Sequence, residues 1–214
     1  MARPHTDIEA GRQQLLDIVE DIVRQRGGVD LSMTDLAAAA GMSPANLYRF
    51  FESKEALLEA AAGRWFAPKI AIMEEVVASD LPVRDKMYQF FVRRFVQMRD
   101  QYREDPDYFQ SNLELGNRYF EVVRGYVDLG DHYLAQLVAE AMVEGYFPDL
   151  SIDHTVSLIN QMVHCYCNPD ALLYLEPRLS EQKLARIVDT IFIGLGRSFE
   201  ASSGPGTPHI KIVS

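Results

Sequence analysis

Hydrophobic residues recur along almost the whole chain with the period of an α-helix, and this pattern constrains the fold more than any other feature. Pro, Gly, Asn and Asp residues divide the pattern into separate segments. We predict about nine helices, at residues 8–26, 33–40, 44–51, 54–77, 83–103, 106–121, 123–146, 152–167 and 181–200. No convincing alternating strand pattern occurs before the last few residues, so the predicted fold class is all-α.

Length and composition are those of an ordinary globular protein, with 214 residues of which 48% are hydrophobic and 24% charged. No apolar run reaches the roughly 18 residues that a membrane span requires, and the first residues lack the apolar core of a secretory signal. We therefore expect a cytoplasmic protein with no membrane partner. Cys165 and Cys167 lie two apart in a predicted helix, where side chains diverge by about 200°, so we expect two separate thiols.

The net charge of −10, from 31 acidic and 21 basic residues, argues by itself against a nucleic-acid partner. Neutralisation of phosphates by Lys and Arg supplies most of the affinity of ordinary DNA-binding proteins. A DNA-binding site in this chain must therefore come from a local motif.

Such a motif lies near the N-terminus. Ser32 precedes a short predicted helix that stops at Gly41, and Ser43 precedes a second short helix with Pro44 in its first turn. Serine is a favoured N-cap, Pro is tolerated in a first turn, and Gly41 can adopt the left-handed conformation of a tight turn. This spacing predicts a helix-turn-helix, whose second helix enters the major groove of DNA.

Residues 15–61 resemble the N-terminal domain of the TetR (tetracycline repressor) family. The matching residues, in register and without a gap, are Asp35-Leu36-Ala37, Ala40-Gly41-Met42-Ser43, Leu47-Tyr48, Phe51, Ser53-Lys54-Glu55 and Leu57. The resemblance implies a three-helix DNA-binding domain at residues 1–52 and a helical ligand-binding and dimerisation domain at 53–200. Residues 201–214, rich in Ser, Gly and Pro, are predicted to form a flexible tail.

The DNA-binding candidates follow from this resemblance and from the physics of helix ends. Tyr48 lies one residue past a predicted core position and should project outward. Lys54 opens a helix at the end that disfavours a cation, which favours an external phosphate as its partner, and the resemblance implies the same role. Arg49 could contact DNA or be a solvated surface residue. The full set of candidates is Ser32, Thr34, Ser43, Pro44, Ala45, Asn46, Tyr48, Arg49 and Lys54.

The N-terminal segment departs from a basic DNA-binding domain in its charge. Residues 1–66 contain seven Lys or Arg against ten Asp or Glu, a net charge of −3. Helix N-termini and hydroxyl groups should therefore contribute more to phosphate binding than charge does, which predicts moderate affinity and a shallow salt dependence. The side-chain amide of Asn46 could recognise an adenine by hydrogen bonds to the N6 and N7 atoms of the base.

Ligand and dimer sites are expected in the C-terminal part, where the resemblance implies a shared helical fold rather than a motif. Aromatic residues concentrate between Trp65 and Tyr133, and they could be ordinary core or line a cavity for a small apolar or aromatic effector. The ligand-binding candidates are Trp65, Phe91, Phe95, Tyr108, Tyr119 and Tyr126. An apolar stripe near the C-terminus could be core or dimer seam, and the candidates for the seam are Ile187, Ile191, Leu195 and Phe199.

The favoured interpretation is a ligand-responsive transcriptional regulator, a repressor that binds a palindromic operator in double-stranded DNA as a homodimer. A helical interaction protein of the same fold that has lost DNA binding is the main alternative, and an all-helical enzyme is a third. No catalytic constellation, Gly-rich phosphate loop or Cys/His cluster is present in the sequence, so we expect no enzymatic activity, cofactor or metal.

Overall fold

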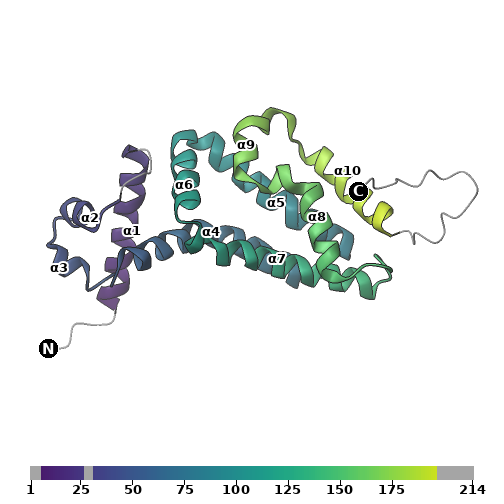
Figure 1. The fold of residues 1–214 in the computed structure, drawn as a ribbon, viewed down its shortest axis with the longest axis horizontal. Coiled ribbons are helices and arrows are strands. Elements are labelled where there is room, and N and C mark those ends of the chain that lie inside the picture. The colour runs from purple at the N-terminus through teal and green to yellow at the C-terminus, as the bar shows by residue number, and fades with distance from the viewer. Residues whose placement is uncertain (1–5, 27–30, 197–214) are drawn as a thin grey trace, which may run out of the picture. The chain divides into compact units, whose positions relative to one another are not determined.

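The chain folds into helices, as its hydrophobic period predicts (Figure 1). The structure is a computed structural model that describes residues 6–26 and 31–196. Within these ranges it contains no β-strand, which confirms the all-α fold class. The helices are α1 (Thr6–Arg26), α2 (Met33–Ala39), α3 (Pro44–Leu47), α4 (Lys54–Ala78), α5 (Val83–Glu104), α6 (Pro106–Arg118), α7 (Phe120–Val143), α8 (Ile152–Cys167), α9 (Pro169–Leu175) and α10 (Glu181–Leu195).

Helix α9 is absent from the nine predicted helices, and that part of the prediction is wrong. Asn168 and Pro169 separate α8 from α9: Asn168 is the N-cap of α9, and its side chain accepts a hydrogen bond from the N–H of Asp170. Proline lacks only an N–H that a first helical turn leaves unpaired, so it can begin a helix as readily as it ends one. Leu172 is fully buried and anchors this short helix.

The chain forms two compact units, which are described separately. Unit 1 comprises residues 1–72 and 96–130, and unit 2 comprises residues 73–95 and 131–214. Helices α4, α5 and α7 contribute residues to both units. No helix in the described part of the chain is both long and apolar enough to cross a membrane.

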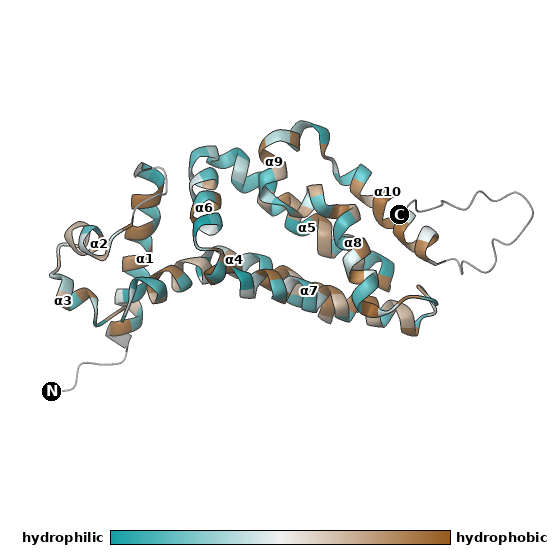
Figure 2. Cartoon of the chain, in the orientation of Figure 1, coloured by the Kyte–Doolittle hydropathy of each residue, from teal (hydrophilic) through white to brown (hydrophobic). Residues whose placement is uncertain are grey.

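Unit 1 is built around the apolar face of α1. Leu15, Leu16, Val19, Ile22 and Val23 are buried along this face. They share one cluster with buried residues of α2, α3 and the start of α4, and with partly buried residues of α6 and α7. Hydrophobic and hydrophilic residues accordingly occupy different sides of these helices (Figure 2). Helices α2 and α3 therefore rest on the same core as α6.

Unit 2 has a core rich in phenylalanine. Phe95 packs edge-on against Tyr166 with 5.1 Å between ring centroids, and Phe147 lies 5.2 Å from Phe192. Lys86 is buried here, with only 8% of its side chain exposed. Its Nζ atom donates to both carboxylate oxygens of Glu140, at 2.9 and 3.0 Å, and to the carbonyl of Val77 at 3.2 Å. A buried ammonium needs such partners because it has lost its hydration.

This buried charge generates a prediction about stability. We expect Glu140→Gln to lower the free energy of unfolding by about 1–3 kcal/mol, because it leaves the buried ammonium group of Lys86 with neutral partners alone. Lys86→Met should cost less, because the partly exposed Glu140 can then be hydrated and the aliphatic stem is retained. Urea unfolding followed by circular dichroism measures both changes. If both variants lost the same free energy of unfolding, the explanation by the deeper burial of Lys86 would be wrong.

Candidate nucleic-acid interface

Three serines begin the helices of the predicted motif. The Oγ atom of Ser32 accepts a hydrogen bond from the N–H of Asp35 at 3.0 Å, and that of Ser43 accepts one from Asn46 at 3.2 Å. Ser53 caps α4 in the same way, accepting from Ala56 at 3.0 Å. Each cap satisfies one of the N–H groups that a helix N-terminus leaves unpaired, and the remaining ones stay available to anions.

The turn between α2 and α3 depends on Gly41, which has a φ of +65°. The N–H of Gly41 donates to the carbonyl of Ala38, and the N–H of Met42 donates to that of Ala37. These two bonds form a Schellman motif, which ends α2 and turns the chain toward α3. The left-handed residue predicted in the turn is therefore present.

One side of helix α3 packs against the core, and the other side faces solvent. Leu36, Leu47, Phe51 and Leu57 are all buried. Tyr48 is 51% exposed and projects away from this core. Helix α3 is shorter than predicted, because the chain beyond Leu47 continues as turns in which Arg49 and Phe50 bond to carbonyls three residues back. Such tightening is common in the last turn of a helix.

The DNA-binding candidates differ in exposure. Thr34, Ser43, Pro44, Ala45, Tyr48 and Arg49 are exposed, and Ser32, Asn46 and Lys54 are partly buried. Asn46 lies close to two neighbours, with its Oδ1 atom 3.5 Å from Arg49 and its Nδ2 atom 4.0 Å from the sulfur of Met42. The motif thus has a hydroxyl, an amide and a guanidinium group within or just after α3.

Lys54 has a partner that sequence reasoning missed. Its Nζ atom lies 5.3 Å from the ring centroid of Tyr119, which follows the last residue of α6. Sequence reasoning assigned Tyr119 to a ligand site instead, because aromatic periodicity cannot say which neighbouring element a ring will meet.

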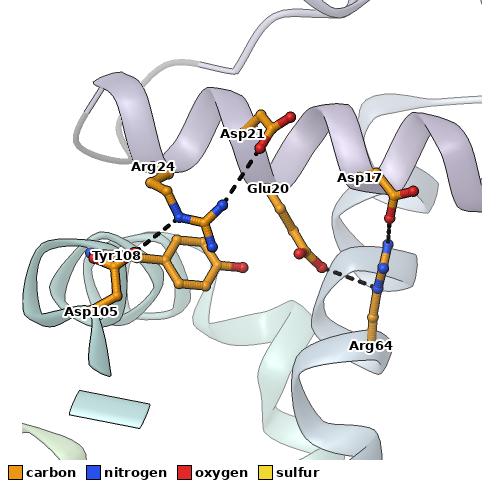
Figure 3. Close-up of polar contacts among 7 residues, drawn as sticks. All are labelled: Asp17, Glu20, Asp21, Arg24, Arg64, Asp105 and Tyr108. Atoms are coloured by element: carbon orange, nitrogen blue, oxygen red, sulfur yellow. Dashed lines mark hydrogen bonds and ion pairs between the residues drawn. The ribbon is translucent and has the colours of Figure 1, made fainter. Parts of the chain in front are cut away.

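Charged residues of α1 are paired with α4 and α6 (Figure 3). Arg64 of α4 bridges Asp17 at 2.6 Å and Glu20 at 3.1 Å. Arg24 donates to Asp105, the N-cap of α6, at 2.9 Å, and lies 3.5 Å from Asp21. Three of the ten carboxylates of residues 1–66 are thus paired with two of the seven cations of the same segment, so these groups contribute −1 to its net charge of −3.

Asp105 and Tyr108 connect this network to the start of α6. The N–H of Tyr108 and, after it, Arg24 hold the pKa of Asp105 below its usual value. The guanidinium of Arg24 lies over the ring of Tyr108, 4.5 Å from its centroid. Burial raises the pKa of Tyr108, with a smaller contribution from the charge of Glu20, so the phenol stays neutral at physiological pH.

The ligand-binding candidates do not form one group. Trp65 packs edge-on against Tyr108 at 5.9 Å, and Tyr126 stacks on Phe66 at 4.8 Å, all within unit 1. Lys69 lies beside these rings, with its Nζ atom 4.5 Å from the ring of Trp65. Tyr119 also belongs to unit 1, whereas Phe91 and Phe95 are fully buried in unit 2.

The candidate dimer residues also differ among themselves. Ile187 and Leu195 are partly exposed, whereas Ile191 is fully buried within the protomer. Phe199 lies outside the described residues. Ile193, which was not among the candidates, is 56% exposed on α10. A wide apolar stripe covers more than one side of a helix, so sequence alone could not divide it between core and exposed surface.

Two protein families match the chain. Residues 21–61 match the family described as bacterial regulatory proteins, tetR family, and residues 83–188 match the family described as tetracyclin repressor-like, C-terminal domain. An HTH-type transcriptional regulator of Staphylococcus aureus is 33% identical over 90 residues, which are 40% of this chain and 46% of the relative. The fatty acid metabolism regulator protein of Bacillus subtilis is 22% identical over 127 residues, 58% of this chain and 66% of the relative. The matched segment thus spans less than two thirds of each relative's length.

Solved structures share the fold. The fatty acid degradation regulator FadR from Bacillus halodurans superposes with a TM-score of 0.58 at 16% identity, over 90% of this chain and 97% of that one. The TetR family transcriptional regulator PfmR from Thermus thermophilus superposes with a TM-score of 0.56 at 20% identity, over 87% and 98% of the two chains.

The turn at Gly41 generates a second prediction. We expect Gly41→Ala to destabilise the protein by about 1–2 kcal/mol, because a side chain disfavours the left-handed conformation. An added Cβ atom would meet no other atom within 4 Å, so the cost is purely conformational. Gly41→Asn is the matched control and should lose less, since Asn tolerates this conformation. Denaturant unfolding measures both, and an equal loss for Ala and Asn would point to steric rather than conformational strain.

Proposed function

The chain belongs to the TetR family of bacterial regulatory proteins, and on that premise we propose that it is a ligand-responsive repressor that binds a palindromic operator as a homodimer. The observation that carries the proposal is the geometry of α2 and α3. Two short, Ser-capped helices are held on a buried core by a Gly41 turn, and Tyr48 and Arg49 remain exposed. Such a regulator acts on the chromosome, in the cytoplasm.

We assign the DNA contacts by chemistry. The N-terminal N–H groups of α2 and α4, with Ser32, Thr34 and Lys54, bind phosphates, which set the register of the protein on the duplex. The major groove is faced by Pro44, Ala45 and Asn46 of α3, by its N-cap Ser43, and by Tyr48 and Arg49 just after it. Asn46 reads an adenine, and Tyr48 donates its hydroxyl hydrogen to a phosphate or a base edge.

The homodimer follows from the palindromic operator. A dimer places its two α3 helices in successive turns of the major groove, about 34–36 Å apart. We propose that α8 and α10 supply the dimer surface, which the partly exposed Ile187 and Leu195 and the exposed Ile193 support. A dimer whose α3 helices have a different spacing does not fit the operator. An effector that binds this state more tightly than the DNA-binding state lowers operator affinity, at most by the ratio of its affinities for the two states.

The effector is proposed to be a small apolar or aromatic molecule. The aromatic cluster of Trp65, Phe66, Tyr108 and Tyr126 in unit 1 supports this, because rings supply apolar contact area with few polar demands. Two similar proteins are named as regulators of fatty acid metabolism and of fatty acid degradation. Acyl compounds are therefore the first effectors to test.

A helical interaction protein without DNA binding is the second candidate. The net charge of −3 in residues 1–66 favours it, because phosphate binding ordinarily demands a basic surface. The composition of residues 43–49 weakens this objection, since none of them is acidic and Arg49 is exposed.

The decisive experiment is a mobility shift on DNA flanking the protein's own gene, at two salt concentrations. We expect Lys54→Gln to weaken binding equally on all sequences and to reduce the salt slope by about one, because it removes one phosphate contact. Asn46→Ala should instead relax the choice of base at one position, by about 1–3 kcal/mol. Arg124→Gln, an equal loss of charge on the exposed face of α7, is the control and should change neither. A folded dimer that shifts no specific DNA at low salt would support the interaction protein.

Trp65 provides an assay for the effector. It is the only tryptophan of the sequence, and it packs on Tyr108 and Phe109 in unit 1. We expect titration with fatty acids and their acyl thioesters to change its fluorescence saturably, because a bound apolar molecule alters the surroundings of the indole ring. Tyr126→Ala should weaken that response, whereas Tyr174→Ala, at an exposed ring of unit 2, should not. Saturable binding without a change at Trp65 would place the effector elsewhere.

A further inference from the structure

Helix α6 makes a contact at each of its ends. Its N-cap contacts α1, and the residue after its last turn contacts Lys54, the first residue of α4. At its N-terminus, Asp105 accepts hydrogen bonds from the side chain of Arg24 at 2.9 Å and from the N–H of Tyr108 at 3.0 Å (Figure 3). At its C-terminus, the ring of Tyr119 lies 5.3 Å from Nζ of Lys54. The second contact involves the residue to which the proposed function assigns a DNA phosphate.

The backbone and packing around Tyr119 fix its position. Its N–H donates to the carbonyl of Leu115 at 3.0 Å, and its own carbonyl accepts from Val122 at 2.9 Å. Leu115, Tyr119 and Val122 all pack against the buried cluster that includes α1, α2 and α3. This packing restrains the ring, so an outward movement of Lys54 separates the ammonium group from it.

Lys54 has an electrostatic reason to lie on this ring. It is the first residue of α4, where the helix dipole is positive and disfavours a cation. The face of an aromatic ring carries partial negative charge and attracts an ammonium group. Lys54 is partly buried in this arrangement, whereas Tyr48 and Arg49 are exposed. In the DNA-free protein, the ring thus supplies the negative partner that a phosphate would supply in the complex.

We propose that Tyr119 holds Lys54 back from DNA, so that binding to DNA requires the ammonium group to exchange the ring for a phosphate. Tyr119 is then a positioning residue that lowers the DNA affinity of the free protein. The inference rests on the proposed function, because it takes Lys54 to be a phosphate contact. It also gives α6 a direct means of regulation, since a movement of Tyr119 changes how readily Lys54 reaches the DNA.

The test measures the dissociation constant of full-length protein for two duplexes at fixed low salt: the operator, and a random duplex of equal length. Tyr119→Leu keeps an apolar side chain and removes the ring. We expect it to tighten binding about two- to fivefold on both duplexes, because an exposed cation–π contact is lost only from the free state. The factor should be equal on both, since phosphates carry no sequence information. In a Lys54→Gln background, Tyr119→Leu should have no effect on binding.

Two further variants separate the ring's electrostatics from packing. Phe120→Leu removes the neighbouring exposed ring and is the matched control. Trifluorophenylalanine at position 119 keeps the ring but cancels its negative face, so it should tighten binding relative to phenylalanine at the same position. This comparison remains decisive if Tyr119→Leu fails to fold.

Each outcome has a distinct meaning. Unchanged or weaker binding by folded Tyr119→Leu, or by the fluorinated variant, overturns the inference and leaves the proposed regulator intact. Tightening that persists in the Lys54→Gln background also overturns it, because the ring would then act through another residue. If the wild-type protein binds neither duplex, the proposed function and this inference both fail.

Discussion

The apolar face of α1 is the surface on which the rest of unit 1 depends. Helices α2 and α3 are too short to be stable alone, since isolated helices below about 12–15 residues are marginal in water. They persist because Leu36 and Leu47 are buried in the same cluster as Leu15 and Val19 of α1. Helix α6 packs on that cluster through Leu115. One helix therefore supports both the DNA-binding motif and an element beyond it.

The polar side of α1 explains how an acidic segment can serve a DNA-binding motif. Net charge counts carboxylates without regard to their partners, whereas phosphates respond to the field at the interface. Arg64 binds Asp17 and Glu20, and Arg24 binds Asp105, so these charges pair with one another among α1, α4 and α6. Residues 43–49, which include the exposed Tyr48 and Arg49, contain no acidic residue. The charge of the segment and the charge of its recognition surface are thus different quantities.

Most of the fold could be predicted because its determinants are local. Helical periodicity, the Ser caps and Gly41 each act within a few residues, and the structure has all of them where the sequence placed them. Helix α9 was not predicted although Asn168-Pro169 has the cap-then-proline pattern of Ser43-Pro44, because a helix of seven residues has too few turns to show a clear apolar period. The division of Phe91 and Tyr108 between two units also depends on contacts between residues far apart in the chain, which periodicity does not contain.

Tyr108 makes two kinds of contact within unit 1: aromatic packing and contact with a charged side chain. The two kinds can contribute different amounts of free energy to coupling between these helices. Its ring lies against Trp65 of α4 and beneath Arg24 of α1. The Arg24–Asp105 pair is solvent-exposed, and such pairs contribute only about 0–1 kcal/mol. Allosteric coupling typically requires about 1–3 kcal/mol. Packing between Trp65 and Tyr108 involves a larger, partly buried aromatic area and can supply the larger share.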